Sequence, residues 1–328
     1  MKVAMERITA WRRLVASGLA ACAVAVIAST ASVAATGSGT NAVIGAQTGA
    51  APDTMGPHST VPYGVYDPGG DFSNDPYVQI EHIFMPWEDV SLTSLQRADA
   101  YALARHRALL VTIEPWTWSK SERNTPAALI RGIFDGSYDK NMSTICSELG
   151  SLRSPVTVRW AQEMDNKHRF IWAGWKPATY IAAYRRMIDI CRAVAPSIRY
   201  MWSPLGNEDM AKYYPGDNYV DIVGISVFGY QPYDRGIYGH DRDFYEIMGP
   251  RYARAAQFGK PVVVAELGYS GDQAYVDKWT DEIRNIGNRY PQLVGLVYFN
   301  YPELYPWPHG YGKPDWRIHH RVIKLPNS

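Results

Sequence analysis

The sequence lacks an excess of charge of either sign, and it contains little cysteine. Its 328 residues carry 33 Lys and Arg against 32 Asp and Glu, so composition offers no electrostatic case for binding nucleic acid or an acidic membrane surface. The 3 cysteines show no zinc-type spacing. We therefore expect neither a metal nor an organic cofactor, which leaves any chemistry to ordinary side chains.

The sequence also lacks a hydrophobic run that could span a bilayer comfortably. Leu14–Ile27 is apolar but too short, and it follows a basic N-terminal segment. Ser32–Ala34 and Val33–Ala35 fit small-residue cleavage sites, so residues 1–35 are predicted to be a cleaved signal peptide. The mature chain would be secreted or periplasmic, without a membrane span. Lipoprotein anchoring through Cys22 is the alternative, although the residues after Cys22 stay apolar where a lipoprotein usually becomes polar.

After the predicted signal, residues 36–60 are rich in Gly, Thr, Ala and Ser and show no periodicity, which indicates a disordered leader. The folded domain is predicted to occupy residues 61–328. Removal of the signal leaves Cys146 and Cys191, both in predicted helices. An oxidising compartment would allow a disulfide between them, and two buried free thiols fit the sequence equally well.

Aromatic residues are abundant, with 11 Trp and 23 Tyr. Part of this content is expected in a large hydrophobic core. Flat aromatic faces also stack on the apolar C–H faces of pyranose rings, so the same composition suits a sugar-binding cleft.

Strand-like and helix-like segments alternate along the folded domain. The predicted strands are Gly64–Tyr66, Val78–Met85, Ala108–Ile113, Val156–Trp160, Ile198–Trp202, Val220–Phe228, Val262–Ala265 and Leu293–Phe299. The predicted helices are Leu92–His106, Met142–Leu152, Pro177–Val194, Tyr245–Phe258 and Tyr275–Arg289. This alternation predicts an α/β fold of the (β/α)8 TIM-barrel type in a single catalytic domain. A doubly wound open sheet is less attractive, because no glycine-rich phosphate turn follows the first strand.

Two of these buried strands are followed by a glutamate. Glu163 comes shortly after the strand that begins at Val156, and Glu266 comes directly after the strand that begins at Val262. An unpaired charge is too costly to bury in a core, and a barrel places its chemistry at the C-terminal ends of its strands. Two glutamates so placed are what a glycosidase needs to protonate a leaving oxygen and to attack an anomeric carbon.

Several segments, in order, resemble glycoside hydrolase family 26, whose members include β-mannanases, β-glucanases and xylanases. They are Arg159–Asn166, Phe170–Gly174, Trp202–Pro204, Tyr213–Gly224 and Val264–Gly268. The resemblance covers roughly residues 156–301 and is weaker before them. It implies a retaining mechanism with Glu163 as acid/base and Glu266 as nucleophile, their carboxyl groups about 5–5.5 Å apart. Arg159 is a candidate cation to keep Glu266 ionised.

The resemblance also implies substrate-binding residues, and here the chain departs from the family. Gln162 stands where the family usually has His, and Phe228 stands nearest a Tyr that bonds the nucleophile, with Tyr230 as its candidate replacement. Tyr298 or Phe299 stands in place of a Trp platform. The remaining predicted sugar contacts are Trp172 and Trp202. These departures put the identity of the sugar in doubt, mannan above all.

We therefore predict a secreted retaining endo-β-glycosidase. Its substrate would be a mannan, a β-glucan or the cell's own exopolysaccharide, and the protein would act as a monomer. A non-catalytic carbohydrate-binding barrel is the alternative from another class. A transglycosylase would use the same covalent intermediate and pass it to a sugar, a difference that the sequence does not reveal.

Overall fold

The structure, a computed structural model, describes residues 61–88, 90–116, 125–167 and 169–325. The predicted signal peptide at 1–35 and the predicted leader at 36–60 lie outside the described residues.

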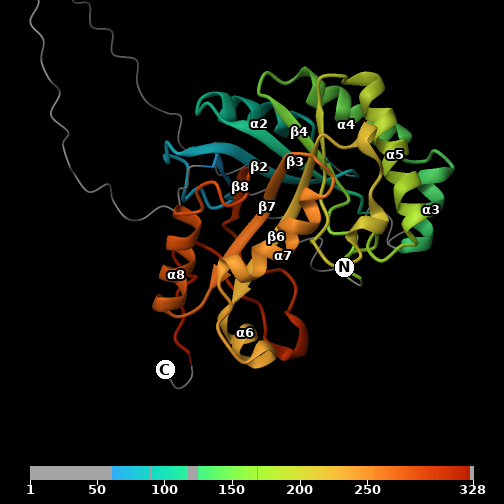
Figure 1. The fold of residues 1–328 in the computed structure, drawn as a ribbon. Coiled ribbons are helices and arrows are strands. Elements are labelled where there is room, and N and C mark those ends of the chain that lie inside the picture. The colour runs from blue at the N-terminus through green and yellow to red at the C-terminus, as the bar shows by residue number, and fades with distance from the viewer. Residues whose placement is uncertain (1–60, 89, 117–124, 168, 326–328) are drawn as a thin grey trace, which may run out of the picture.

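Eight parallel strands close into a barrel in chain order, with β8 paired to β1. The strands are β1 (Tyr63–Tyr66), β2 (Val78–Pro86), β3 (Ala108–Glu114), β4 (Val156–Trp160), β5 (Arg199–Trp202), β6 (Ile222–Tyr230), β7 (Val262–Ser270) and β8 (Leu293–Phe299). The α-helices are α2 (Thr93–Leu103), α3 (Pro126–Phe134), α4 (Asp139–Ser151), α5 (Pro177–Val194), α6 (Gln231–Tyr238), α7 (Phe244–Ala256) and α8 (Gln273–Arg284). Short 3-10 helices occupy Met210–Tyr213, Asp217–Tyr219 and Pro308–Gly310. Helices lie around the outside of the strands (Figure 1). The predicted (β/α)8 barrel is confirmed.

Strand β3 shows how the barrel sorts its side chains. Leu109 and Val111 belong to the large core between the strands and the helices, whereas Leu110 belongs to a smaller apolar cluster inside the barrel. Because side chains two residues apart share one face of a strand, Thr112 and Glu114 continue the inward face of Leu110. The interior thus changes from apolar to polar toward the C-terminal ends of the strands, where a barrel places its chemistry.

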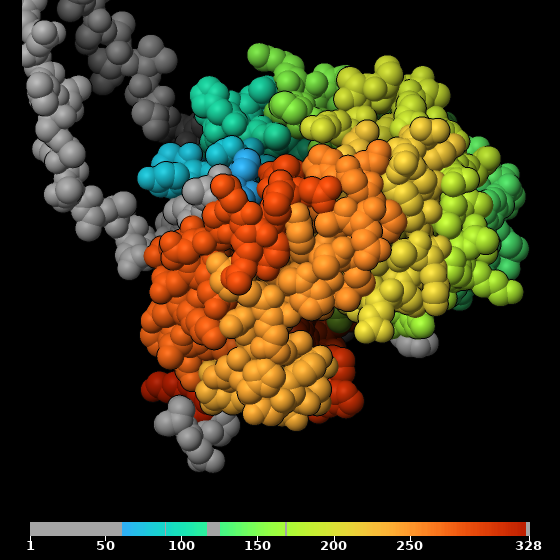
Figure 2. Space-filling model, viewed as in Figure 1, coloured from blue at the N-terminus to red at the C-terminus, as the bar shows by residue number. Residues whose placement is uncertain are grey.

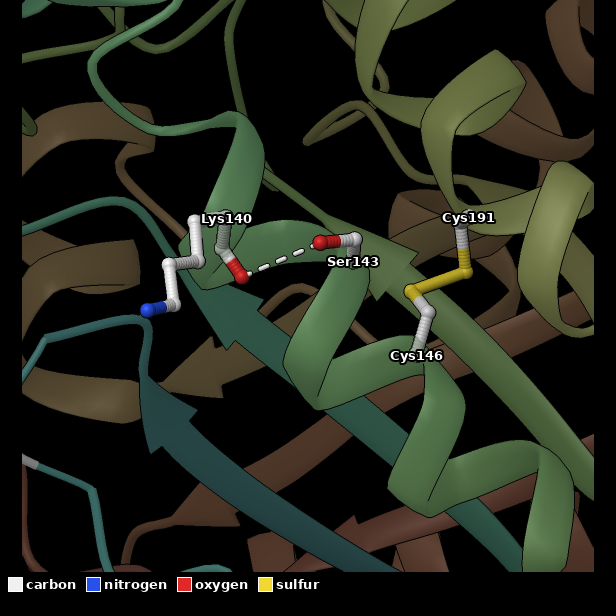
Figure 3. Close-up of a disulfide and its surroundings, with 4 residues drawn as sticks. All are labelled: Lys140, Ser143, Cys146 and Cys191. Atoms are coloured by element: carbon white, nitrogen blue, oxygen red, sulfur yellow. Dashed lines mark hydrogen bonds between the residues drawn. A yellow bond between two sulfur atoms is a disulfide. The ribbon is translucent and has the colours of Figure 1, made fainter.

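A disulfide joins the two helices that flank β4. Cys146 of α4 and Cys191 of α5 are bonded, with their Cα atoms 5.1 Å apart, and both are fully buried (Figure 3). Of the two states that the sequence leaves open, the structure has the disulfide. The bond ties together the helices before and after the strand that leads to Glu163.

Two helices were not predicted, strand β6 is shifted by two residues from its predicted range, and strand β7 is longer than predicted. Helix α3 begins after Thr125, whose side chain accepts a hydrogen bond from the N–H of Ala128. Helix α6 follows β6 directly and lies beyond the C-terminal end of that strand (Figure 1). Strands β6 and β7 each run to 9 residues. Within the described part of the chain, no helix combines the length and the apolar character that a membrane crossing requires.

Candidate active site

A cavity of about 450 Å³ lies at the C-terminal ends of the strands, and both predicted catalytic glutamates line it. The other lining residues are Asn166, Lys167, Arg169, Phe170, Leu205, Asn207, Phe228, Tyr233, Tyr238, Arg242, Arg251, Phe299, Glu303, Pro306, Trp307 and Pro308. In the space-filling view the surface is hollowed beside the light-orange α6, and dark-red atoms of the C-terminal part of the chain lie deeper there (Figure 2).

Glu163 sits just past the end of β4 in an unusual backbone conformation. Its φ is +53°, in the left-handed region that costs a non-glycine residue about 1–2 kcal/mol. Neighbouring strands hold it there: its N–H donates to the carbonyl of Ser203 at 2.7 Å, and the hydroxyl of Ser226 donates to its Oε1 at 2.6 Å. Backbone strain held in place by tertiary contacts is typical of functional positions. Only 7% of Glu163 is exposed, on the side of the cavity.

Glu266 lies within β7 and forms an ion pair inside the barrel. Nη1 of Arg159 donates to Oε1 of Glu266 at 2.7 Å, and Arg159 is completely buried. The hydroxyl of Thr112 lies 3.4 Å from the same Nη1 atom. An opposite charge at this distance favours the ionised carboxylate. Arg159 thus lies where a cation that keeps the predicted nucleophile charged would have to be.

A third carboxylate, Glu114, lies beneath the cavity and is engaged by protein groups. Its Oε1 accepts from Nε2 of Gln162 at 2.7 Å, and its Oε2 accepts from Nε1 of Trp116 at 3.0 Å. Glu114 and Gln162 are both buried and do not line the cavity. The side-chain amide of Gln162, which was predicted to contact sugar, therefore donates its hydrogen bond to Glu114 in this structure.

Asp165 organises the loop after β5, a role that the sequence reading missed. Its carboxylate accepts the backbone N–H groups of Leu205, Gly206 and Asn207 at 2.6–3.1 Å. Burial raises the pKa of Asp165 above its ordinary value, and these N–H groups oppose that rise. The only sequence signal for this role is that Asp165 lies in the Arg159–Asn166 segment, two residues after Glu163.

Arg251 of α7 is a second residue that the sequence reading missed. Its Nη1 donates to the backbone carbonyl of Ser226, the residue whose hydroxyl holds Glu163. Burial lowers the pKa of Arg251 to about 10, and the negative charge of Glu163 opposes that fall. No sequence signal marks it, because it comes from the middle of a helix and meets the site only after folding.

Aromatic side chains form one wall of the cavity. Phe228, one of the predicted sugar contacts, lies on it together with Tyr233, Tyr238, Phe299 and Trp307. The rings of Tyr233 and Trp307 meet edge to face, with centroids 4.9 Å apart. Tyr230 packs against Trp307 from outside the lining set. We call Phe228, Tyr233, Tyr238, Phe299 and Trp307 the aromatic wall.

Three predicted sugar contacts lie away from the cavity because they belong to the core. Trp172, Trp202 and Tyr298 are fully buried. Trp172 donates to the carbonyl of Gln162, and Tyr298 donates to the carbonyl of Trp316. Trp202 packs edge-on against other aromatic rings. A sugar could reach none of the three without displacing the core, so the structure offers no direct contact for them.

Carboxylates and histidines do not gather into a metal site in the described ranges: no group of three or more His, Cys, Asp or Glu that could hold an ion is found there. What the cavity does gather is a pair of glutamates, one hydrogen-bonded to a serine hydroxyl and one ion-paired to a buried arginine, beside an aromatic wall. A parallel barrel with such a pair on the side of its C-terminal strand ends suits glycoside hydrolysis.

The comparison with protein families agrees. The family model of glycosyl hydrolase family 26 matches residues 135–299, which include both glutamates, and the chain belongs to this family. Among curated proteins, Endoglucanase H of Acetivibrio thermocellus is 26% identical over 74% of this chain and 26% of its own length. A β-1,3-xylanase of an Alcaligenes species is 29% identical over 31% of this chain and 22% of its own length. The chain thus spans about a quarter of the length of these relatives.

Solved structures show the same fold. A mannanase of Bacillus subtilis superposes with a TM-score of 0.51 at 16% identity, covering 74% of this chain and 82% of that one. A β-(1,4)-mannanase of Podospora anserina also reaches 0.51 at 12% identity, covering 80% of this chain and 60% of that one. At such identities the likeness concerns the fold alone.

Proposed function

We propose that this protein is a secreted endo-acting glycoside hydrolase that cleaves a β-linked polysaccharide with retention of anomeric configuration. The observation that carries the proposal is that Glu163, just past the end of β4, and Glu266, within β7, line one cavity in different surroundings. Glu163 receives a neutral hydroxyl donor and Glu266 receives a cation. Environments that differ in this way assign different roles to two carboxyl groups.

In the first step, the ionised carboxylate of Glu266 attacks the anomeric carbon while Glu163 gives its proton to the departing glycosidic oxygen. The bond from the anomeric carbon to that oxygen breaks, and an ester to Glu266 forms. Arg159 keeps the attacking oxygen ionised, and Ser226 aims the proton donor.

In the second step, Glu163 acts as a base. It takes a proton from a water molecule whose oxygen attacks the anomeric carbon of the ester. Glu266 leaves as a carboxylate, and both side chains return to their starting state. Two displacements at one carbon give net retention.

The substrate class rests on the relatives and on the aromatic wall. The similar curated proteins are named an endoglucanase, β-1,3-xylanases and a mannan endo-1,4-β-mannosidase. Aromatic faces beside the glutamates suit pyranose rings. We propose a β-glucan, a mannan, a xylan or an exopolysaccharide of the producing cell, met outside the cytoplasm after export.

The test is product release from a panel of soluble mannans, β-glucans, xylans and the producing cell's exopolysaccharide. Wild type is compared with Glu163→Ala and Glu266→Ala. We expect one polymer to be cut into oligosaccharides whose first-formed anomers, seen by NMR, keep the β configuration, and both variants to lose at least about 100-fold in kcat/KM. A protein that cuts nothing but binds one polymer equally well without either glutamate would be a binding barrel.

A further inference from the structure

The catalytic cavity continues into a second cavity that the proposed reaction does not use. This second cavity has a volume of about 710 Å³ and is lined by Asp165, Lys167, Asn207, Glu208, Asp209, Arg242, Glu246, Ile247, Pro250, Arg251 and Arg254. Four residues, Lys167, Asn207, Arg242 and Arg251, line both cavities. We call these four residues the junction. A polymer that leaves the catalytic glutamates on this side must pass them.

The junction consists of hydrogen-bond donors. Three of its members are cations and the fourth is an amide. Two of the cations have carboxylate partners. Arg242 forms an ion pair with the fully buried Asp234 at 2.7 Å, and Lys167 makes a longer contact of 3.6 Å with Asp209. The charge of Arg242 is therefore balanced, whereas that of Lys167, with its side chain 60% exposed, is balanced weakly.

Arg251 has more unused capacity than the other cations. Within the described ranges no carboxylate lies within 4.0 Å of its guanidinium, and its one hydrogen bond goes to the carbonyl of Ser226. A guanidinium has five N–H donors in a planar fork that fits a carboxylate with two parallel bonds. The side chain of Arg251 is partly buried, so a ligand anion would reach it with little competing water.

In the described part of the chain, none of the acidic residues that line the second cavity forms an ion pair with Arg251, although the charge of Asp165 acts on it at longer range. Asp165 accepts three backbone N–H groups, and Glu246 accepts from the ring of His240 at 2.9 Å. Asp209 is the long partner of Lys167, and Glu208 is exposed to solvent. The side chains that line both cavities at the junction are therefore three cations and an amide.

We propose that the junction is a subsite for a sugar that carries a carboxylate, such as a uronic acid, so that the natural substrate is an acidic β-glycan. This proposal rests on the function proposed above, because it places the acidic sugar beside the bond that is cut. Arg251 and Lys167 are the residues that would recognise the carboxylate. The neutral rings of the same chain would lie against the aromatic wall.

The experiment uses polymer pairs that differ only in charge. A soluble β-glucan and a mannan are compared with samples of the same polymers partly oxidised at the C6 hydroxyl to carboxylate, and a glucuronoxylan is compared with its carboxyl-reduced form. The measured quantity is the preference, kcat/KM on the acidic form divided by kcat/KM on the neutral form. Equilibrium binding of each form is measured in parallel. The proteins are wild type, Lys167→Gln, Arg251→Gln, Arg251→Lys and the control Arg199→Gln, an exposed arginine at the opposite end of the barrel.

For wild type we expect a preference of about tenfold or more, the size of one charge-assisted hydrogen bond, and a fall when salt is added. Lys167→Gln and Arg251→Gln should each reduce the ratio severalfold whatever their absolute rates, Arg251→Lys should keep part of it, and Arg199→Gln should keep all of it. A wild-type ratio of one or below, or a ratio unchanged in both glutamine variants, overturns the acidic subsite while cleavage still supports the hydrolase. Tighter binding of the acidic form without cleavage of any polymer supports the subsite and overturns the hydrolase. No binding and no cleavage overturns both.

Discussion

At the scale of single residues, Glu163 is held in place by groups from other strands. Its left-handed backbone is anchored by the carbonyl of Ser203 after β5, and its carboxyl group is held by the hydroxyl of Ser226 in β6. Ser226 is itself held at its carbonyl by Arg251. The position of the proposed proton donor therefore depends on side chains that would not touch the glycosidic bond.

Replacing Ser226 by Ala should slow catalysis without unfolding the protein. Loss of the 2.6 Å hydrogen bond frees the carboxyl group of Glu163, and we expect kcat to fall about tenfold, with KM changed less than twofold. The matched control is Ser203→Ala, because the buried hydroxyl of Ser203 has no hydrogen-bond partner in the described part of the chain. Steady-state kinetics of both variants decide the matter, and equal rates in all three proteins would refute a positioning role for Ser226.

Glu81 gives the free energy of unfolding a pH dependence of known sign. Burial raises the pKa of Glu81 from 4.5 to about 7, although the Arg107 guanidinium at 2.8 Å opposes the rise. Between pH 4.5 and 7 the folded chain holds a proton that the unfolded chain has released, so stability falls as the pH rises through this window.

Glu81→Gln should remove this dependence. Relative to the variant, wild type should lose about 1–3 kcal/mol of unfolding free energy from pH 4.5 to 7.5, measured by urea unfolding at several pH values. Asp281→Asn, at an exposed position of α8, serves as the control and should follow wild type. If the wild-type and Glu81→Gln curves run parallel across this range, the raised pKa is wrong.

At the scale of elements, α6 and the chain after β8 build the aromatic wall. Helix α6 brings Tyr233 and Tyr238, and the chain after β8 brings Trp307. The two segments lock together at Gly236, where an added Cβ would lie 1.5 Å from the hydroxyl oxygen of Tyr311. Gly236 is a poor helix former in the interior of α6, although Pro232 suits its first turn, so the propensity of Gly236 opposes a helix that tertiary packing nevertheless imposes.

Trp307→Ala should weaken substrate binding and leave the chemical step nearly intact. One lost aromatic face predicts an increase in KM of about three- to tenfold, with kcat within twofold of wild type. Trp307→Phe should recover most of the loss. Tyr77→Ala is the control, because Tyr77 is exposed next to the start of β2, at the other end of the barrel. A fall in kcat at constant KM would instead place Trp307 in the chemical step.

At the scale of the whole molecule, the disulfide closes a loop of the chain around β4. Cys146 and Cys191 are 45 positions apart in sequence. Cross-linking two points at such a separation reduces the freedom of the unfolded chain, an effect of about 2–4 kcal/mol. Both helices lie outside the barrel, away from the cavity, so the bond acts on stability rather than on the site.

Reduction of the protein, or the double change Cys146→Ser and Cys191→Ser, should therefore lower Tm by roughly 5–15 °C. The kcat/KM at 25 °C should stay within twofold of wild type. Calorimetry with and without reductant measures the first effect, and reduced wild type controls for the serine substitutions. An unchanged Tm, with both thiols shown to be free by titration, would mean that the bond contributes nothing.

The sequence predicts the barrel well because the alternation of apolar strands with helices is a local signal. Strand β4, helix α5 and strand β8 have the predicted bounds. Glu163 follows β4 as expected, whereas Glu266, predicted directly after its strand, lies within the longer β7. The supporting groups are different. Ser226 and Arg251 reach Glu163 only when β6 and α7 pack beside β4, and no local pattern records that contact. For the same reason, the burial of Trp172 and Trp202 could not be separated from exposure in the cleft.

Strand β4 couples the two carboxyl groups mechanically. Arg159 in this strand anchors Glu266 across the barrel at 2.7 Å, and the same strand runs on into Glu163. Any breathing of the barrel that displaces β4 therefore moves the proton donor and the anchor of the nucleophile in the same direction. One strand thus supports both the carboxyl group of Glu163 and the cation that holds Glu266.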